Sequence, residues 1–292
     1  MKIAVIGASG YIGLNLISQL IEKTDHQIVA ISRNSESITF DSPRLSKHNV
    51  SVFNDSLAKY LKDSDVLYYL VHMMAQHKID YALAEAKAAE KLKAAVSGSS
   101  IKKIIYLGGL GDDKDSLSKH LASRHRTGEL LRQNKCQVIE FRASMVIGKG
   151  SISYDIIVNL VTKLPFLTLP KWSETLTQPI GLNDAITYLI RALNIKEAES
   201  KIVEIGGPDV LSYEQLMRQY AQWRGLKRLF IRLPIIPIAV SAWWLNLFTP
   251  KNEAKVGRAM IESLQNKMVV TNKDAEVLFP DIHPEHLIKS FV

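Results

Sequence analysis

The sequence has almost no cysteine and no leader-like segment at its start. Cys136 is the single cysteine among 292 residues, which excludes a disulfide framework and fits a reducing compartment. It stands at the start of a strand-like run, which indicates a buried structural thiol and not a nucleophile. Because a strand pattern begins directly after Met1, no room is left for a signal peptide. We therefore expect a cytoplasmic protein.

Several function classes lack their sequence signals. The net charge is +8, but the lysines and arginines are scattered and form no dense basic stripe, so nucleic-acid binding is not expected. The histidines at 72 and 77, and at 120 and 125, are five residues apart and share no helix face, so we expect no metal site. No G-x-S-x-G turn follows a strand, which argues against a serine hydrolase.

Charge is also missing from the stretch 233–250, which lies between Arg232 and Lys251 and contains Trp243 and Trp244. The stretch is too short and too broken by proline to span a bilayer. Three interpretations stay open. Its tryptophans make a weak contact with a membrane surface, it admits an apolar substrate, or it packs on the smaller lobe or on the partner in a homodimer.

The strongest motif that is present lies at the start of the chain. The apolar run Ile3–Ile6 leads into a turn with glycines at 7, 10 and 13, and an apolar-periodic helix follows. Gly7 allows a tight turn, Gly10 lets the backbone approach a pyrophosphate, and Gly13 lets the helix pack on the strand. The first N–H groups of the helix then face the phosphates. The expected cofactor-binding residues of this turn are Gly7, Ala8, Ser9, Gly10, Tyr11, Ile12 and Gly13.

The second expected strand, 27–31, bears on the choice of cofactor. NAD-preferring folds carry an acidic residue near its end, which binds the ribose 2′-OH. None lies between His26 and Ser35, and Arg33 stands there instead. A guanidinium is suited to grip a 2′-phosphate. The sequence therefore favours NADP(H), with NAD(H) as the alternative and a solvated loop charge as the other interpretation of Arg33.

Strand-like and helical stretches then alternate. We expect strands near 50–53, 65–71, 103–107 and 137–141, a short helix capped at 54–56 and ending near 61, and longer helices over 79–96 and up to 132. This alternation predicts an α/β Rossmann fold with a doubly wound parallel sheet over residues 1–150. Ligands of such sheets lie beyond the carboxyl ends of the strands. The residues expected there are Val71, His72, Met73, Leu107, Gly108, Gly109, Ser144, Met145 and Val146.

From about residue 151 the pattern loosens. We expect a helix over 156–164, a loop or short strand over 165–170, a helix capped by Asn183 or Asp184, and a strand over 201–207. Ser212 and Gln215 have the spacing of a capping box that opens a helix ending near residue 223. Residues 151–292 are thus predicted to form a smaller α/β region on the substrate side.

Six stretches together resemble the atypical short-chain dehydrogenase/reductases, which are NAD(P)H-binding or NmrA-like proteins related to the extended family. They are GASGYIG (7–13), YLVHMM (69–74), IYLGGLG (105–111), EFRASMVIG (140–148), QPI (178–180) and EIGGPDVLSY (204–213). The resemblance covers nearly the whole chain and implies the fold and the cofactor, but it says almost nothing about a substrate. It also implies that Asp55, after the third strand, approaches the adenine.

The chain departs from that family at the catalytic positions. Extended members use a Ser after the fifth strand and a Tyr-x-x-x-Lys pair on the next helix. Here Gly108 and Gly109 replace the Ser, Leu121 stands in the Tyr position, and His125 stands in the Lys position. Leucine cannot transfer a proton, so the usual mechanism is absent.

Two functions remain. As a reductase, the protein would pass hydride to a small electrophilic substrate by proximity, with His72, His125 or His120 as candidate proton donors. His125 is also a candidate ribose contact in place of the Lys, and its alternative is an exposed helix histidine beside Arg124 and Arg126. As a regulator, the protein would bind NADP(H) without chemistry and act as a redox sensor or scaffold.

Overall fold

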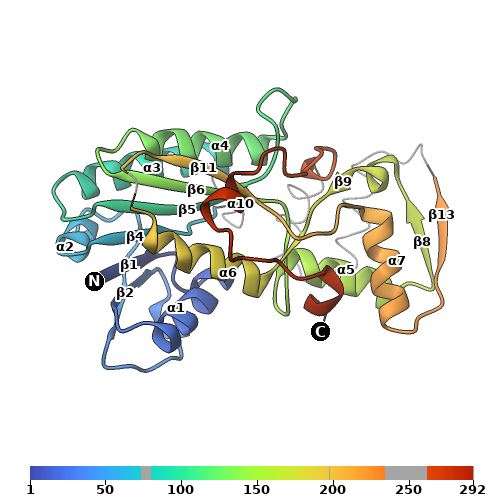
Figure 1. Cartoon of the computed structure of the whole chain (residues 1–292), viewed down its shortest axis with the longest axis horizontal. Helices are drawn as coiled ribbons and strands as arrows, with labels where there is room; N and C mark the ends of the chain where they lie inside the picture. The colour runs from blue at the N-terminus through green and yellow to red at the C-terminus, as the bar shows by residue number, and fades with distance from the viewer. Residues whose placement is uncertain (74–79, 197, 234–261, 292) are drawn as a thin grey trace.

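Seven parallel strands form the central sheet of the protein. The computed structural model describes residues 1–73, 80–196, 198–233 and 262–291, and Figure 1 shows the sheet with helices on either side. The strand order is β3-β2-β1-β4-β5-β6-β11. The strands are β1 (Lys2–Ile6), β2 (Gln27–Ser32), β3 (Leu45–Asn49), β4 (Val66–Tyr69), β5 (Lys103–Gly109), β6 (Gln137–Ala143) and β11 (Lys201–Ile205).

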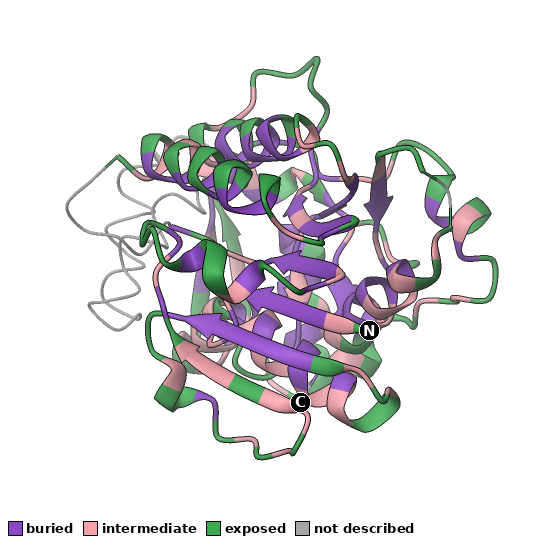
Figure 2. Cartoon of the chain, turned by 90° about the vertical axis from the view of Figure 1, so that its left-hand side faces the viewer, coloured by how far each residue is buried: buried purple, intermediate pink, exposed green. Residues whose placement is uncertain are grey.

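Side chains that alternate along each strand build a core on both faces of the sheet. Ile3 and Val5 of β1 belong to the core under α1 (Tyr11–Lys23) and α6 (Leu182–Arg191). Ala4 and Ile6 belong to the core under α2 (Leu57–Leu61), α3 (Tyr81–Ser97) and α4 (Lys119–Arg132). Strands buried on both faces read as continuous apolar runs, as β1 does. Figure 2 shows these strands as buried, and the predicted doubly wound Rossmann fold is confirmed.

The predicted third strand is wrong by several residues. The strand is β3, Leu45–Asn49, and the predicted range 50–53 lies after its end. Val50 and Val52 are nevertheless buried. β3 lies at the edge of the sheet and pairs with β2 alone, so its sequence LSKHN needs no apolar run. The apolar signal comes from the loop that follows it.

A smaller lobe follows β6 and lies at the far end of the molecule from the N-terminus (Figure 1). Helices α5 (Ile152–Lys163) and α7 (Tyr213–Trp223) surround a third core. Strands β8 (Phe166–Leu169) and β13 (Leu229–Arg232) pair in parallel beside it. The remaining elements are β7 (Val146–Ile147), β9 (Leu176–Thr177), β10 (Ile180–Gly181), β12 (Leu211–Ser212), α10 (Asp274–Leu278) and 3-10 turns at Ser35–Ser37, Lys171–Glu174, Ala192–Asn194 and Leu287–Ser290.

The two predicted helix starts in this region have different outcomes. The capping box of α7 is present, with the Gln215 amide donating to Ser212 Oγ at 3.1 Å and the Ser212 amide donating to Gln215 Oε1 at 2.7 Å. The predicted cap of α6 is wrong, because Gly181 is its N-cap and Asn183 already lies inside the helix. The Asp184 carboxylate instead accepts the amide of Glu285 at 3.0 Å.

Part of the chain after residue 150 packs on the central sheet and not in the smaller lobe. After the first part of the smaller lobe the chain returns to the central sheet, where α6 packs on α1 and β11 pairs with β6. The chain then leaves again for α7. Residues 182–205 therefore extend the nucleotide-binding layer, although they lie within the expected C-terminal region.

The uncharged stretch 233–250 lies outside the described residues except for Leu233. Its three interpretations, membrane-surface contact and homodimer packing included, stay predictions. Among the helices of the described ranges, none is long and apolar enough to cross a membrane.

Candidate functional site

The glycine turn before α1 has the backbone geometry that its spacing predicts. Gly7 has a φ of +87°, and a Cβ there would lie 2.7 Å from the carbonyl oxygen of Leu70. A Cβ on Gly13 would overlap the carbonyl oxygen of Gly7. Gly10 is different, because its Cβ would meet only the Gly7 oxygen, at 3.2 Å. Gly7 and Gly13 thus serve the packing of the turn, whereas Gly10 keeps its outer side open.

The start of α1 offers unpaired amides on that open side. Gly10 is the N-cap and no side chain caps the helix, so the first N–H groups remain available to an anion. Ala8 is fully buried and Ile12 packs against the core. The Tyr11 hydroxyl is buried against Gly148 and has no hydrogen-bond partner within the described ranges. Burial, and then the charge of Asp155, raise the pKa of Tyr11 to about 12.

A cavity of about 200 Å³ opens next to this turn. It begins at the glycine turn, extends over the ends of β1 and β2, and reaches the segments after β3 and β4. Seven predicted cofactor-binding residues line it, namely Gly7, Ser9, Gly10, Arg33, Val71, His72 and Met73. Its other walls are Ile6, Ile31, Ser32, Val50, Ser51, Val52, Phe53 and Leu70. The open glycine, the uncapped helix and the cavity together fit the diphosphate and adenosine of a dinucleotide.

Two predicted residues near the adenosine end have different surroundings. Arg33 is exposed at the cavity, and its guanidinium has no hydrogen bond or ion pair with any described residue. Asp55 is not among the cavity residues. Its carboxylate pairs with Lys91 Nζ at 2.9 Å, and this hydrogen bond lowers the pKa of Asp55. Val52 and Phe53 occupy the wall on which Asp55 was expected.

The predicted residues beyond β5 and β6 are tightly packed. A Cβ on Gly109 would lie 2.7 Å from Leu121 Cδ2, and one on Gly108 would lie 3.2 Å from the Tyr106 ring. Ser144 Oγ donates to the Gln178 carbonyl at 2.6 Å. The Met145 carbonyl accepts the Ile180 amide, and Val146 pairs with Ile180 in the β7–β10 ladder. These contacts join the central sheet to the smaller lobe, and they place Ser144, Met145 and Val146 at the junction.

Arg124 is a site residue that the sequence did not reveal. Its buried guanidinium donates to the Val71 carbonyl at 2.9 Å and also to the Leu107 carbonyl. It lies 3.7 Å from Glu85 of α3, which is 2% exposed and accepts the amide of Met73 at 3.2 Å. Arg124 therefore fixes the ends of β4 and β5. The sequence Arg124-His125-Arg126 does not indicate that the first arginine points inward.

His125 is buried, which contradicts the interpretation as an exposed helix histidine. It is 4% exposed, and its Nδ1 contacts the carboxylate of Asp113 while its Nε2 lies 3.0 Å from the Gly109 carbonyl oxygen. Both partners are acceptors, so both ring nitrogens are held by the protein. This arrangement leaves neither nitrogen for a ribose or for proton transfer to a substrate.

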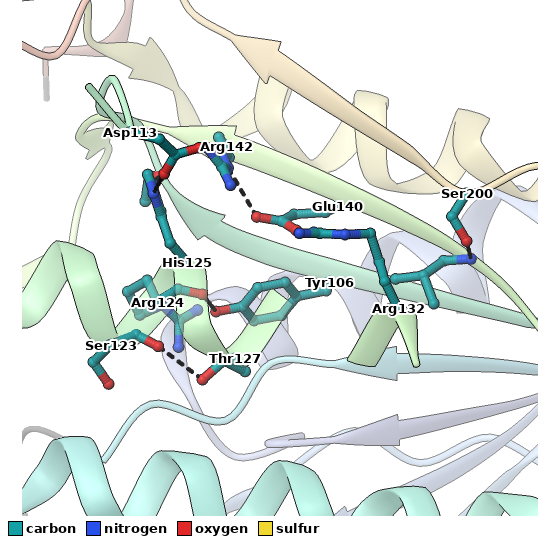
Figure 3. A network of polar contacts seen from close by, with 12 residues as sticks. Tyr106, Asp113, Ser123, Arg124, His125, Thr127, Arg132, Glu140, Arg142 and Ser200 are labelled. Carbon is teal, nitrogen blue, oxygen red and sulfur yellow. Dashed lines mark hydrogen bonds and ion pairs between the residues drawn. The ribbon is translucent and has the colours of Figure 1, made fainter. Parts of the chain in front are cut away.

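The His125 contact belongs to a network of charges shown in Figure 3. Asp113 also accepts Arg142 at 3.1 Å, and Arg142 Nε donates to Glu140 Oε1 at 2.8 Å. Glu140 is fully buried and also accepts Arg132. A Cβ on Gly128 of α4 would overlap the Glu140 carboxylate. Because Gly128 has no side chain, it leaves room for this buried carboxylate.

His72 and His120 meet at the end of β4 and the start of α4. Their Nε2 atoms are 2.9 Å apart, and the rings stand edge to face. His72 is solvent-accessible through the cavity, although protein atoms crowd its ring. Desolvation, then Arg124 and His120, hold the pKa of His72 well below its usual range. Desolvation and then Arg124 lower the pKa of His120 to about 3.

Within residues 1–73, 80–196, 198–233 and 262–291, no group of three His, Cys, Asp or Glu side chains could hold a metal ion.

The family comparison agrees with this geometry. The model of the protein family described as NAD(P)H-binding matches residues 7–144. That range begins at the glycine turn and ends just past β6, so it contains most of the cavity wall. A comparison with curated proteins finds no match.

Solved structures share the fold over 90–100% of the chain. A nucleoside-diphosphate-sugar epimerase from Staphylococcus aureus has a TM-score of 0.78 and 17% identity, covering 100% of this chain and 99% of its own. Triphenylmethane reductase from Citrobacter sp. has a TM-score of 0.78 and 15% identity, covering 100% and 98%. UDP-glucuronic acid 4-epimerase from Bacillus cereus, in complex with NAD, has a TM-score of 0.69 and 20% identity, covering 90% and 99%.

At such identities the structural likeness establishes the fold. The match over residues 7–144 adds that this part of the chain is similar to a family described as NAD(P)H-binding. Its cofactor is a nicotinamide dinucleotide. The choice between NAD(H) and NADP(H) lies beyond this likeness, because the similar structures include a complex with NAD and one with NADP(H).

The buried carboxylate beside α4 makes a prediction about stability. Alanine at position 128 gains about 1 kcal/mol of helix propensity, but its methyl group must displace Glu140 from its arginines. Overpacking alone costs about 1–3 kcal/mol, and loss of the buried ion pairs adds to it. Gly128→Ala should lower the free energy of unfolding, by about 2 kcal/mol, in urea titrations. Gly98→Ala is the control, because a Cβ there meets nothing within 4 Å.

The histidine pair makes a prediction about pH. The unfolded chain takes up a proton at His120 near pH 6.5, whereas the folded protein does so only near pH 3. The free energy of unfolding should therefore fall as the pH drops through this window, and this contribution should be absent above it. His120→Gln should flatten the slope in urea unfolding measured from about pH 8 to about pH 4. Equal slopes for wild type and His120→Gln, with exposed His283→Gln as the control, would show that His120 titrates normally.

Proposed function

We propose that the chain is an NADP(H)-dependent reductase that passes hydride to a small electrophilic substrate without the Tyr-Lys pair. The cofactor supplies the hydride, and the chain's own residues bind it, orient it and exclude water. The open side of Gly10 and the uncapped α1 receive the diphosphate. The single cysteine favours the reducing cytoplasm as its place of action.

The observation that carries the NADP(H) preference is the free guanidinium of Arg33 at the cavity. It stands at the end of β2 with Ser32 and Ser51 as cavity neighbours, and it has no partner among the described residues. In NAD-binding folds an acidic residue near this point accepts a hydrogen bond from the ribose 2′-OH. No acidic residue stands at the end of β2 here. A 2′-phosphate would supply the missing partner through charge-assisted hydrogen bonds.

Reduction is supported by a reductase of the same fold and by the side chains at the site. Triphenylmethane reductase, also solved as a complex with NADP(H), has this fold over the whole chain. A triphenylmethane dye is a delocalised cation, and such a molecule becomes neutral on gaining a hydride, with no proton consumed. A site whose Tyr position is Leu121 suits acceptors of that kind. Carbonyls and quinones need a proton as well, and His72 is the described titratable side chain that reaches the cavity with a ring nitrogen unbound.

A specific observation favours the alternative of a sensor without chemistry. The positions of Ser, Tyr and Lys hold Gly108 and Gly109, Leu121 and His125, and both nitrogens of His125 are bound by the protein. Such a protein would bind NADP(H) tightly and change its contacts with the redox state of the cofactor. Such a protein would not transfer hydride from NADPH to any added acceptor.

The cofactor assignment predicts the effect of removing the guanidinium. Arg33→Ala should weaken NADPH binding by about 10- to 100-fold, because charge-assisted hydrogen bonds contribute roughly 1.5–3 kcal/mol. NADH binding should change by less than about twofold, since NADH has no 2′-phosphate. Fluorescence titration of both nucleotides measures the ratio. Arg126→Ala is the matched control, because Arg126 is exposed and pairs with Glu129.

An unchanged NADPH-to-NADH ratio in Arg33→Ala would remove the phosphate contact from the proposal. The reductase and the sensor are separated by a second assay on the wild-type protein. Crystal violet, menadione and 4-nitrobenzaldehyde are offered with NADPH, and absorbance at the nicotinamide band is followed. Saturable binding without oxidation of NADPH by any of the three acceptors would establish the sensor.

A further inference from the structure

Four side chains form a continuous line of hydrogen bonds from the start of α4 to the cavity. Ser118 Oγ lies 3.0 Å from Ser263 Oγ, which lies 3.0 Å from His120 Nδ1. His120 Nε2 lies 2.9 Å from His72 Nε2, and His72 lines the cavity. The Nδ1 atom of His72 has no partner among the described residues. The internal atoms of the line are therefore paired, and its last residue, His72, lines the cavity.

This line of hydrogen bonds lies beside the half of the sheet over which the nicotinamide ring of a dinucleotide is expected. A dinucleotide bound across the order β2-β1-β4-β5 would place its adenosine half over β1 and β2, near Arg33, and its nicotinamide half over β4 and β5. His72 follows β4, and His120 is in the first turn of α4, which follows β5. Arg124, which holds Val71 and Leu107, is one helical turn beyond His120. The reactive ring of a dinucleotide that crosses from β1 to β4 would approach His72.

The charges around the two rings keep them neutral. The Arg124 guanidinium on α4 disfavours a second positive charge, and desolvation acts in the same direction on both rings. The Glu85 carboxylate on α3 is already engaged with Arg124, the Met73 amide and Ser123. A neutral imidazole has one N–H donor and one acceptor nitrogen. Two such rings that share a hydrogen bond must alternate, so one Nε2 carries the proton and the other accepts it.

We propose that His72 and His120 form a two-imidazole relay that delivers the proton consumed when a carbonyl or quinone is reduced at this site. The inference rests on the proposed reductase function. Hydride adds to the electrophilic carbon, and the C=O π pair becomes an alkoxide lone pair. His72 Nδ1–H donates its proton to that oxygen, and the proton on His120 Nε2 passes to His72 Nε2. His120 Nδ1 then takes the Ser263 hydroxyl proton, Ser263 takes the Ser118 hydroxyl proton, and a proton from solvent restores Ser118.

The relay moves protons without ever charging a ring. Each imidazole gains a proton on one nitrogen as it loses one from the other, so each exchanges one neutral tautomer for the other. This suits a site beside a buried guanidinium, where an imidazolium would be destabilised. A neutral histidine can also polarise a carbonyl through its N–H before the proton moves. His72 is thereby the proton donor, and His120 acts through it.

One test needs neither cofactor nor substrate. Long-range 15N–1H NMR of the imidazole rings in the cofactor-free protein at neutral pH reports the tautomer of each. We expect His72 protonated on Nδ1 and His120 protonated on Nε2. The Nε2–H signal of His120 should shift in His72→Gln and stay in place in His283→Gln, the control at an exposed histidine. Imidazolium rings at neutral pH, or an Nε2–H signal that His72→Gln leaves unmoved, would overturn the relay.

The second test separates the relay from a merely structural role. With NADPH, menadione and 4-nitrobenzaldehyde need a hydride and a proton, whereas crystal violet needs only the hydride. In His72→Gln and His120→Gln the ratio of carbonyl to dye turnover should fall at least about 10-fold, since general acid catalysis contributes roughly 10²–10⁴. The wild-type proton inventory in H2O–D2O mixtures should be curved for the carbonyl, because two or more protons move together.

The outcomes distinguish the relay from the function on which it rests. Turnover of all acceptors with an unchanged carbonyl-to-dye ratio in both variants overturns the relay and leaves the reductase standing. NADPH binding without turnover of any acceptor by the wild type overturns the reductase and the relay with it. A lowered ratio in both variants, but not in His283→Gln, supports the relay.

Discussion

The buried charge of Arg124 is the interaction on which the arrangement of the site depends. A guanidinium removed from water is stable only if it is fully compensated, and here two strand-end carbonyls and Glu85 compensate it. Removing one member of such a buried pair costs roughly 3–5 kcal/mol, because the other charge stays unpaired. Val71 is bound by Arg124, and Met73 is bound by Glu85. His72 stands between these two residues, so the ion pair sets the position of its ring.

Two of the residues that stand in the expected catalytic positions lie against each other. Leu121, in the position of the Tyr, lies so close to Gly109 that a Cβ there would come within 2.7 Å of it. A serine at position 109 and a leucine at position 121 would therefore compete for the same space. His125, in the position of the Lys, is turned toward Asp113 and the Gly109 carbonyl. Leu121 and His125, which stand where the resemblance implies Tyr and Lys, thus make a packing contact and a hydrogen-bonded contact within the protein.

Features that are local in sequence could be predicted, and those that depend on distant residues could not. The glycine turn, the buried strands and the capping box of α7 are encoded by neighbouring residues, and the structure has them. The edge strand β3 carries no apolar run because a single neighbour and solvent surround it. Gly181 caps α6 in place of the expected polar residues, and Asp184 is bound by a segment 101 residues away.

The same limit applies to the candidate site. Seven of the predicted cofactor-binding residues line the cavity, because they stand in the glycine turn or directly after β2 and β4, whereas Asp55 pairs with Lys91 and the residues predicted after β5 and β6 lie elsewhere. The inward orientation of Arg124 and the burial of His125 depend on partners in other elements, which no periodicity reveals. His72 and His120 are 48 residues apart in the chain, so their contact exists only through the packing of α4 against the end of β4.

The repeated passage of the chain between the sheet and the smaller lobe limits how that lobe can move. The chain crosses after β6, again before α6 and a third time after β11. Gln178 ties the crossings together, because its carbonyl accepts Ser144 and its side chain bonds to the Gly207 carbonyl at 2.7 Å and the Val270 amide at 3.0 Å. A hinge-like swing of one lobe away from the other would break all of these bonds at once. The smaller lobe is therefore expected to keep its position relative to the sheet when a dinucleotide binds.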